Sequence, residues 1–278
     1  MQAMIFDVQK NSTVDGPGIR TTVFFKGCNL RCQWCHNPEG CALQPQLLFY
    51  KNRCVGCGRC KQVCPYSLEE CDLCGKCEKA CPSGARKICG REYTVEELVE
   101  EIVKDKLFYE VSGGGVTCSG GECMLYPEFL TELLKACKNE GVQTAVDTAG
   151  NVPYESFLKV LPYTDILLYD IKCFSEDLHR LGTGVSNALI LDNLTKLSKS
   201  FKGKIIVRIP VVGGYNDDER EMQTIADFLK TLAIQKVELL PYHTLGEHKY
   251  EALGIKHTAF TVPTEQKMKE FEKLFSEK

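Results

Sequence analysis

The stretch "TTVFFKGCNLRCQWC", residues 21–35, joins an apolar run directly to three closely spaced cysteines. Residues 21–27 are rich in Thr, Val and Phe and predict a β-strand. Cys28, Cys32 and Cys35 follow as C-x3-C-x2-C, with no fourth cysteine at a matching spacing. Three thiolates on a [4Fe–4S] cluster leave one iron without a protein ligand, and an open position is how metal sites admit substrate. Merely buried cysteines would not need this spacing after a strand.

Strand-like and helix-like segments alternate through most of the remaining chain. The predicted strands are 21–27, 115–121, 143–150, 165–172, 204–210 and 236–243, and the predicted helices are 94–109, 127–141, 187–200, 218–232 and 263–275. Thr94 is the expected N-cap of the first of these helices. Repeated β–α units imply a parallel sheet, and about six of them predict an α/β fold with a full or partial (β/α)6 TIM-like barrel.

Polar and glycine residues stand where these strands end. The set comprises Cys28, Gly120, Gly121, Glu122, Asp147, Asp170, Lys172, Arg208 and His243. Because the carboxyl ends of parallel strands meet at one rim, we expect these residues to converge there. A lone lysine or histidine is usually a solvated surface residue, so strand-end position is what makes these candidates for a site.

Two further cysteine runs lie at residues 54–65 and 71–82, "CVGCGRCKQVCP" and "CDLCGKCEKACP". Each is C-x2-C-x2-C-x3-C-P, the bacterial ferredoxin run in which the fourth cysteine crosses to the other cluster. The predicted ligand sets are Cys54, Cys57, Cys60 and Cys81 for one [4Fe–4S] cluster, and Cys64, Cys71, Cys74 and Cys77 for the other. Zinc also suits paired C-x2-C spacings, but the repeated full run favours iron–sulfur clusters.

These runs divide the chain into two parts. Residues 44–90 are predicted to be an inserted ferredoxin-like domain, little more than two clusters and their loops, and residues 1–43 with 91–278 form the barrel. The remaining six of the 17 cysteines are expected to be small buried hydrophobic residues: Cys41, Cys89, Cys118, Cys123, Cys137 and Cys173.

Composition narrows the function classes. With 44% hydrophobic and 26% charged residues, the chain is typical of a soluble globular protein. A formal net charge of −3 without a basic stripe argues against nucleic-acid binding. The start, "MQAMIFDVQK", is too short and polar for a signal peptide, and no apolar run reaches membrane-spanning length. Clustered cysteines in a reducing compartment favour metal over disulfides, so we expect a cytoplasmic protein.

Longer motifs then resemble a known family. Residues 11–39, "NSTVDGPGIRTTVFFKGCNLRCQWCHNPE", are similar to the N-terminus of the radical S-adenosylmethionine (SAM) enzymes that activate glycyl radical enzymes, the pyruvate formate-lyase activase family. The other motifs that carry the resemblance are "SGGE" (119–122), "DTAG" (147–150), "YDIK" (169–172), "HRLGTG" (179–184), "VRIPVVGGYND" (207–217) and "LLPYHTLGEHKYEALG" (239–254). The insert resembles the longer subgroup, since the simplest members lack one.

The resemblance implies roles for individual residues. SAM binds the open iron held by Cys28, Cys32 and Cys35, and these cysteines with Lys172 form the implied catalytic set. The implied SAM-binding residues are Trp34, His36, Ser119, Gly120, Gly121, Glu122, Asp147, Lys172, Arg208 and His243. A sodium or potassium site is implied at Asp147, Thr148, the main chain of Leu168, and Asp170. Cys123 stands where the family often has proline, which changes the rigidity of the turn more than its chemistry.

Each SAM contact has an expected form. Gly120 and Gly121 let the backbone approach the SAM amino group. Ser119 and Glu122 cap either the SAM ammonium or the following helix. Trp34 or His36 packs against the adenine, and Asp147 holds the ribose or the cation. Lys172, Arg208 and His243 face the carboxylate and its neighbours.

The implied reaction activates a partner protein. One electron from the cluster cleaves SAM, and the 5′-deoxyadenosyl radical takes a Cα hydrogen from a glycine of a glycyl radical enzyme. Asp15 in "DGPG" is expected to hold the partner's glycine loop, although "DGPG" also reads as a β-turn. The two auxiliary clusters would relay electrons from a flavodoxin or ferredoxin, be structural, or dock the partner. A monomer without nucleic-acid or membrane partners is expected.

The partner itself is not encoded in an obvious motif. The compact insert favours trans-4-hydroxy-L-proline dehydratase among partners that include glycerol or diol dehydratases, choline lyase, isethionate lyase and hydroxyphenylacetate decarboxylase. Two other classes of function remain open. A ferredoxin-type electron carrier would explain eight cysteines but not the barrel, and a radical SAM enzyme acting on a small molecule or RNA would not be expected to share "DGPGIR" and "LPYH".

Overall fold

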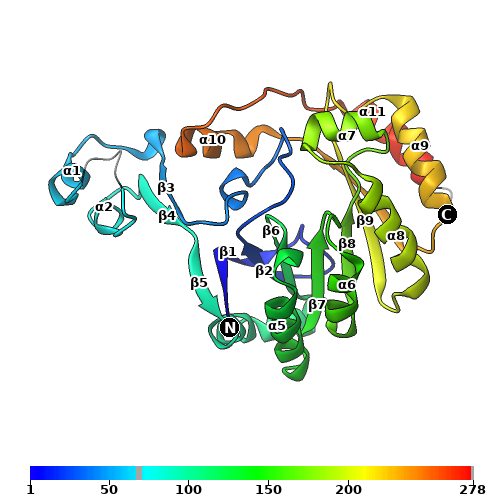
Figure 1. Ribbon diagram of the computed structural model, residues 1–278, viewed down its shortest axis with the longest axis horizontal. Coiled ribbons are helices and arrows are strands. Elements are labelled where there is room, and N and C mark those ends of the chain that lie inside the picture. The colour runs from blue at the N-terminus through cyan, green and yellow to red at the C-terminus, as the bar shows by residue number, and fades with distance from the viewer. Residues whose placement is uncertain (67–70, 277–278) are drawn as a thin grey trace.

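A single open sheet organises the molecule. The computed structural model describes residues 1–66 and 71–276. Eight strands form the sheet in the order β10-β9-β8-β7-β6-β2-β1-β5 (Figure 1). Six of them are parallel: β2 (Arg20–Phe25), β6 (Gly115–Gly120), β7 (Gln143–Thr148), β8 (Ile166–Asp170), β9 (Lys204–Val211) and β10 (Lys236–Pro241). Because β10 and β5 do not pair with each other, the predicted barrel is partial.

Two antiparallel strands at one edge were not predicted. β1 (Gln2–Ser12) pairs with β2, and β5 (Arg91–Thr94) pairs with β1. Most of β1 is exposed or half-buried, so it lacks the apolar run that marks the inner strands. Together the two strands cover the edge of β2, which would otherwise present unpaired main-chain groups.

The long predicted helices are confirmed, with shifted ends. They are α5 (Pro127–Asn139), α8 (Ala188–Ser200), α9 (Glu219–Lys230) and α11 (Glu265–Phe275). Shorter helices are α6 (Tyr154–Val160), α7 (Glu176–Thr183) and α10 (Glu247–Leu253), and single turns of 3-10 helix are η1 (Pro38–Gly40), η2 (Lys51–Arg53), η3 (Cys123–Leu125), η4 (Leu161–Tyr163) and η5 (Thr244–Gly246). No helix in the described part of the chain is long and apolar enough to cross a bilayer.

The helix predicted for 94–109 is wrong as a single element. It is divided into α3 (Val95–Val103) and α4 (Lys106–Ser112). Thr94 does cap α3, within a capping box that includes Glu97. The break places Asp105 in the interior, where its Oδ2 accepts a hydrogen bond from Thr21 Oγ1 at 3.0 Å. A polar residue that must be buried against the sheet therefore ends the helix.

The two faces of the sheet carry different kinds of side chain. The outer face carries the main apolar core, including Val146, Leu167 and Val207, which packs against the helices. The inner face has a small apolar cluster of Ala145, Ile166, Leu168 and Ile206. Asp147, Asp170 and Arg208 continue this inner face toward the carboxyl ends of the strands, because side chains alternate between faces.

Arg20 fills the amino-terminal end of the barrel and was not predicted to matter. Its side chain is fully buried. Nε donates to Thr117 Oγ1 at 2.6 Å, Nη1 to Gln143 Oε1 at 3.0 Å, and Nη2 to the Val116 carbonyl at 2.7 Å. Burial lowers the pKa of Arg20 to about 10, so the guanidinium remains charged at neutral pH. It closes the barrel floor below the polar inner residues.

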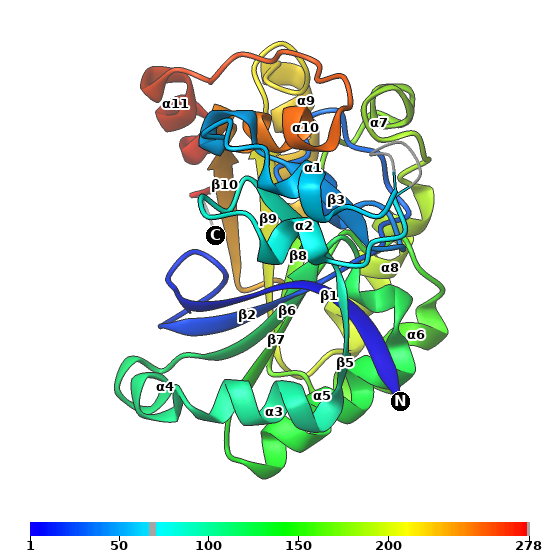
Figure 2. The same cartoon turned by 90° about the vertical axis from the view of Figure 1, so that its left-hand side faces the viewer.

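The insert is more than loops, which corrects the prediction. β3 (Gln46–Phe49) and β4 (Arg86–Cys89) form a two-stranded antiparallel sheet, and α1 (Arg59–Val63) lies beside α2 (Lys76–Lys79) (Figure 2). The β3–β4 pair packs on α10 through Leu48, Cys89 and Ala252. Buried Lys26, just past β2, donates from Nζ to Gln46 Oε1 at 2.9 Å. The insert is thus attached at the carboxyl end of the barrel.

Candidate functional site

The three-cysteine loop follows β2 and is held on two sides. On one side, Gly27 and Cys28 donate their amides to the carbonyls of Gly40 (2.7 Å) and Cys41 (3.1 Å). On the other side, the amide of Arg31 donates to the carbonyl of Thr183 at 2.8 Å, at the end of α7. The "HRLGTG" motif therefore has a structural reason to occur with the cysteine motif, because it positions the loop.

The cysteines of this loop are close enough to influence one another. Burial raises the pKa of Cys28 and of Cys32 to about 12, and the neighbouring thiols contribute to both shifts. No three Cys, His or acidic side chains of the described residues meet at the spacing of a single metal ion. Three thiols on one loop suit a cubane, in which each thiolate would bind a different iron. Such thiols need a metal to become thiolates at neutral pH.

Lys172 supplies the positive charge beside these thiols. Its Nζ lies 3.0 Å from Asp170 Oδ2, and its side chain is 12% exposed. Burial alone would lower the pKa of Lys172, but Asp170 and Cys32 raise it above its ordinary value. The lysine is therefore charged and faces the cysteine loop. An anionic cluster and an anionic ligand group both suit this position.

Asn216 fixes the backbone of Lys172 and was missed in the sequence. Its Nδ2 donates to the Lys172 carbonyl at 2.7 Å and to the Pro210 carbonyl at 2.6 Å. Its Oδ1 accepts the amide of Val212 at 2.8 Å. The residue lies in the "GGYND" part of a motif that carries the resemblance, but no local pattern shows that its amide bridges two strand ends.

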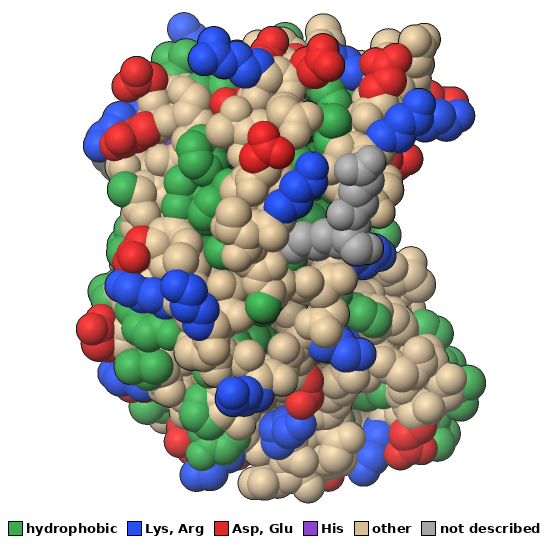
Figure 3. Space-filling view, turned by 90° about the vertical axis from the view of Figure 1, so that its right-hand side faces the viewer, with side chains coloured by type: hydrophobic (Ala, Val, Ile, Leu, Met, Phe, Trp, Pro, Cys, Tyr) green, Lys and Arg blue, Asp and Glu red, His purple; other side chains and the backbone are tan. Residues whose placement is uncertain are grey.

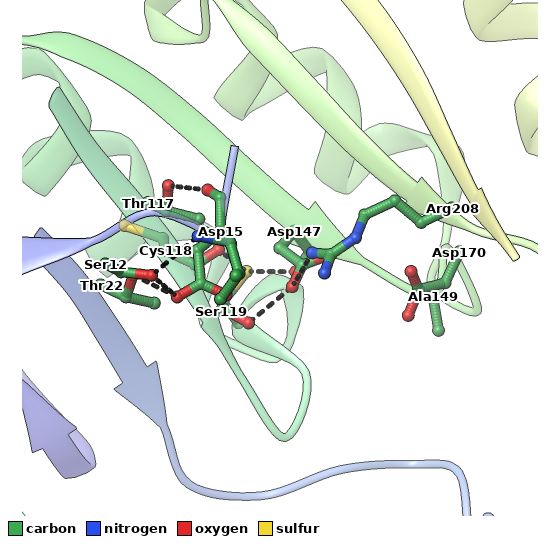
Figure 4. A network of polar contacts seen from close by, with 12 residues as sticks. Ser12, Asp15, Thr22, Thr117, Cys118, Ser119, Asp147, Ala149, Asp170 and Arg208 are labelled. Carbon is green, nitrogen blue, oxygen red and sulfur yellow. Dashed lines mark hydrogen bonds and ion pairs between the residues drawn. The ribbon is translucent and has the colours of Figure 1, made fainter. Parts of the chain in front are cut away.

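Asp147 and Arg208 meet on the inner face, together with Ser119, for which no such contact was predicted (Figure 4). Arg208 Nη1 lies 3.2 Å from Asp147 Oδ2, and Ser119 Oγ donates to the same oxygen at 2.7 Å. Burial raises the pKa of Asp147 to about 6 although Arg208 opposes the shift, so the carboxylate is ionised at neutral pH. Asp147 Oδ1 and Arg208 Nε are buried without a partner among the described residues. Orphaned atoms of this kind fit a site that receives a polar ligand.

The Glu122 side chain is buried and bonded to neighbouring main-chain and side-chain groups. It is 1% exposed. Its Oε1 accepts the Met124 amide at 3.1 Å and Thr148 Oγ1 at 2.8 Å, and its Oε2 accepts the Ala149 amide at 2.9 Å. Of the two expected roles, capping of the following 3-10 turn η3 is confirmed by the bond from the Met124 amide. Ser119, also expected to cap, donates to Asp147 instead.

The predicted cation ligands divide between the two faces of the sheet. Asp147 and Asp170 are on the inner face, and Asp170 already pairs with Lys172. The hydroxyl of Thr148 points to the outer face, where it donates to Glu122 and accepts the Gly150 amide. The Leu168 side chain belongs to the inner apolar cluster. Only main-chain oxygens of Thr148 and Leu168 could share a cation with the two carboxylates.

The "SGGE" glycines are required by close main-chain contact. A Cβ on Gly121 would lie 2.2 Å from the Gly27 carbonyl oxygen and 2.6 Å from that of Gly40. A Cβ on Gly120, whose φ is +120°, would lie 2.3 Å from the amide nitrogen of Phe25. Both glycines bring the end of β6 against the cysteine loop, a reason that precedes any contact with SAM. Cys123, in place of proline, is buried and donates to the Cys118 carbonyl at 3.4 Å.

The aromatic residues of the loop are already packed. Trp34 is 5% exposed and its ring centroid lies 4.2 Å from that of Tyr215. His36 stacks on His243, with centroids 3.9 Å apart and planes 11° apart. Burial and His243 lower the pKa of His36 to about 4, so it is neutral. His243 is exposed and stacks on His36, whereas Lys172 and Arg208 pair with Asp170 and Asp147 on the inner face.

Asp15 points into the barrel and not toward its rim. Its Oδ2 accepts hydrogen bonds from Ser12 Oγ at 2.6 Å and Thr22 Oγ1 at 2.8 Å, and its carbonyl accepts Thr117 Oγ1 at 2.7 Å (Figure 4). The carboxylate therefore holds its own connection between β1 and β2. Any contact with a partner loop would be made from inside the barrel.

The eight cysteines of the insert share one repeated backbone geometry. Gly58 and Gly75 precede α1 and α2 with φ of +72° and +73°. Two residues earlier, Gly56 and Leu73 have φ of +69° and +60°. Cys54, Cys57 and Cys74 are exposed, Cys77 is buried, and Cys60, Cys64, Cys71 and Cys81 lie between these extremes. Left-handed residues at matching places turn successive amides toward one side, as sites for iron–sulfur clusters require.

The scattered cysteines largely meet expectation. Five of them are buried: Cys89, Cys118, Cys123, Cys137 and Cys173. Cys41 is half-buried and lies against the cysteine loop, where its hydrogen bond lowers the pKa of Cys35.

The fold and the site together define an α/β enzyme that carries a three-cysteine iron–sulfur loop at the carboxyl ends of its parallel strands.

Comparisons with known proteins name the family. The radical SAM superfamily profile matches residues 22–226. The trans-4-hydroxy-L-proline dehydratase activating enzyme of Clostridioides difficile is 44% identical over 99% of this chain and 96% of its own length. Activating enzymes of choline trimethylamine-lyase from Oleidesulfovibrio alaskensis and of (2S)-3-sulfopropanediol dehydratase from Klebsiella oxytoca are each 44% identical, over 91% of this chain and 87% and 86% of theirs. The chain belongs to the radical SAM activating enzymes of glycyl radical enzymes.

Solved structures agree on the fold. A radical SAM methyltransferase from Sphaerobacter thermophilus covers 97% of this chain and 73% of its own with a TM-score of 0.57, at 16% identity. Membership in the superfamily implies SAM and a [4Fe–4S] cluster as cofactors. Cys28, Cys32 and Cys35 are the residues of this chain that fit the cluster, because they are mutually close and face the Lys172 cation.

Proposed function

We propose that this chain activates trans-4-hydroxy-L-proline dehydratase, or a closely related glycyl radical enzyme, using SAM and three [4Fe–4S] clusters. Cys28, Cys32 and Cys35 would hold the cluster that supplies the electron for cleavage of SAM to methionine and a 5′-deoxyadenosyl radical, and this radical would remove a Cα hydrogen from one glycine of the partner. The observation that carries the activity is the loop Cys28–Cys35 at the rim of an open barrel, beside the buried cation of Lys172.

The inner polar residues would bind SAM. Lys172 lies beside the cysteine loop and suits the SAM carboxylate. The unpartnered Asp147 Oδ1 and Arg208 Nε suit hydroxyl and carboxylate groups, so these two residues would hold the ribose side of the ligand. Main-chain oxygens of Thr148 and Leu168, with Asp147 and Asp170, are proposed for a sodium or potassium ion. Trp34, His36 and His243 would act by shaping the loop.

The partner's glycine loop would enter through the gap between β10 and β5, which do not pair. Asp15 would line this path from the barrel interior. The choice of partner rests on coverage, since the hydroxyproline-type relative matches 99% of this chain whereas the other two match 91% at equal identity. A gene for a large glycyl radical enzyme beside this one would support that choice. We propose a monomer in the cytoplasm.

The insert would hold the two auxiliary clusters and pass electrons inward. The ligands would be the two sets of cysteines given above, and the donor would be a flavodoxin or ferredoxin. Support comes from the repeated left-handed turns at Gly56 and Leu73 and from the attachment of the insert beside the site loop. In this arrangement the exposed cysteines of the insert would lie at the outer end of the electron path, and Cys28 at its inner end.

One experiment tests the activity. Anaerobically reconstituted protein is mixed with SAM, a low-potential reductant and purified trans-4-hydroxy-L-proline dehydratase. A SAM-dependent glycyl doublet in the electron paramagnetic resonance spectrum is expected. Cleavage of SAM without a protein radical, for any glycyl radical enzyme offered, would instead support a radical SAM enzyme acting on a small molecule or RNA.

A further inference from the structure

The insert differs from the rest of the chain in charge. Residues 44–90 contain eight lysines and arginines against two aspartates and glutamates in the described part and two more at 69–70, a net charge of +4. The whole chain has 34 against 37, so the remainder has 26 against 33, a net charge of −7. Two [4Fe–4S] clusters with eight thiolates would offset this excess, so the case for a charged partner depends on where the basic side chains lie.

These basic side chains are not paired with acidic side chains of the described residues. No basic residue of the insert forms an ion pair with a carboxylate among the described residues, whereas many lysines of the barrel do. Two of the eight pack on aromatic rings, Arg53 over Tyr50 and Arg86 over Phe49. The other six are exposed: Lys51, Arg59, Lys61, Lys76, Lys79 and Lys87.

Apolar side chains and predicted cluster ligands reach the surface among these charges. Val55 is 68% exposed and lies between Cys54 and Cys57, which are also exposed. Tyr66 is 48% exposed. Exposed apolar residues within a charged rim are the usual composition of a protein interface. The site cysteines, in contrast, are half-buried below contacts from α7 and α10.

The opposite side of the molecule provides the contrast. Figure 3 shows acidic and basic side chains interspersed over the side formed by α8, α9 and α11. Several of these residues pair with each other, for example Lys196 with Asp192 at 2.6 Å and Lys230 with Asp227 at 3.8 Å. Mixed, paired charges give no directional field, so electrostatic attraction of an acidic protein is directed to the insert.

We propose that the outer surface of the insert, around Val55, Arg59, Lys61 and Lys79, docks a small acidic electron-carrier protein. This rests on the proposed function, because it needs auxiliary clusters in the insert. With clusters held by the insert cysteines, one electron would pass from the reduced carrier to one insert cluster, so that the carrier would be oxidised by one electron and the cluster reduced by one. No bond forms or breaks. Long-range attraction orients the carrier, and Val55 with Tyr66 provides the apolar contact.

The alternative is that the basic residues only balance the charge of cluster-bound thiolates. Arg86 suits that role, since its Nε is buried and has no partner among the residues that the structure describes. The exposed lysines and Arg59 have no such buried atom, and the solvent around them weakens their attraction to cluster-bound thiolates. Reversing exposed charges should therefore change the encounter with a carrier and leave cluster content and chemical reduction unchanged.

The test uses reconstituted full-length protein without SAM or partner enzyme. The triple variant Arg59→Glu, Lys61→Glu, Lys79→Glu is compared with wild type and with a control, Lys199→Glu, Lys202→Glu, Lys269→Glu, whose exposed lysines are on the opposite side. Cluster bleaching by a reduced flavodoxin is followed by stopped flow. We expect the second-order rate constant to fall roughly ten-fold or more at low salt in the insert variant only, and the gap to close as salt rises.

Two further measurements make the result decisive. Iron content and bleaching by dithionite should match wild type, which excludes loss of the clusters. Calorimetric titration with oxidised flavodoxin should show weaker binding to the insert variant, a readout independent of electron transfer. If the insert variant does not assemble its clusters, the salt dependence of the wild-type bleaching rate is the test. A wild-type rate constant that does not fall as salt rises overturns the docking proposal. Failure of glycyl radical formation would count against the proposed function and leave this result standing.

Discussion

Arg208 and Asp147 form an ion pair across the inner face of the barrel, with Arg208 Nη1 3.2 Å from Asp147 Oδ2. The two residues come from β9 and β7, with β8 between them, so the pair spans three strands. Their side chains are 11% and 15% exposed. Each also has one buried polar atom without a partner among the described residues. The pair is thus both a part of the fold and the best-supported ligand-binding element.

Removing the Arg208 cation alone should destabilise the fold more than removing both charges of the Arg208–Asp147 pair. Arg208→Met leaves the Asp147 carboxylate buried beside Ser119 alone, and we expect the free energy of unfolding to fall by about 3–5 kcal/mol. The double variant Arg208→Met, Asp147→Asn should recover part of that loss. Chemical denaturation of the apo-protein measures both. SAM binding should be lost in both variants, and SAM affinity retained in the double variant would contradict the binding role.

The barrel was predictable from sequence because its signals are local. Strands such as Ile166–Asp170 are continuous apolar runs, and each is followed by an amphipathic helix. The cysteine motifs have spacings that few other structures require. β1 and β5 were missed because they are edge strands without an apolar run, and their pairing depends on residues far apart in the chain.

Side-chain roles at the site were less predictable. Strand ends indicated that Asp147, Arg208 and Lys172 would converge, and they do. Glu122 was assigned partly to SAM because a sequence does not show which face of the sheet a residue after a strand will reach. Asn216 and Arg20 were missed, since a buried bridging amide and a buried guanidinium depend on partners that only the folded chain supplies.

Glu122 should make stability depend on pH in an unusual direction. Burial raises its pKa from 4.5 to about 7, despite hydrogen bonds from Thr148, Met124 and Ala149. The folded protein then binds more protons than the unfolded chain between these values, so this residue's contribution to stability is complete below pH 4.5 and is lost as pH rises through 7. Unfolding of wild type and Glu122→Gln is compared from pH 4.5 to 8.

The expected sign follows from that difference. The unfolding free energy of wild type minus that of Glu122→Gln should decrease by up to about 3 kcal/mol across this range. The substituted amide also places an NH2 group or a single oxygen against three donors, so the variant should be less stable at acidic pH by about 1–3 kcal/mol. A difference that rises with pH would show instead that the three donors keep Glu122 ionised, with a pKa below 4.5.

Leu73 carries backbone strain that its counterpart Gly56 does not. Both have left-handed φ, +60° and +69°, at the same place in the two cysteine repeats. A left-handed L-residue costs about 1 kcal/mol relative to glycine. Leu73→Gly should therefore hold the proposed auxiliary cluster at least as well as wild type, with slower iron release to a chelator. Gly56→Ala, where nothing lies within 4 Å of an added Cβ, should lose iron faster from conformation alone. Equal release rates in both variants would mean that these turns do not shape the cluster loops.

Lys249 joins α10 to the cysteine loop, and its loss should loosen the loop more than a surface ion pair would. Its Nζ lies 2.8 Å from Glu39 Oε1 and donates to the His36 carbonyl at 2.9 Å and to Asn37 Oδ1 at 2.7 Å. Glu39 is only 6% exposed, so Lys249→Met leaves a buried carboxylate without its cation. We expect unfolding to become easier by about 3–5 kcal/mol and the site cluster to bleach faster in air.

The matched control is Lys196→Met, which breaks an exposed pair with Asp192 and should cost no more than about 1 kcal/mol. The double variant Lys249→Met, Glu39→Gln separates charge from packing. If burial of an unpaired carboxylate is the cause, the double variant is more stable than Lys249→Met alone. If it is equally unstable, the hydrogen bonds to His36 and Asn37 carry the effect, because these are lost in both variants. Either way, the rate of cluster bleaching reports whether α10 holds the loop closed.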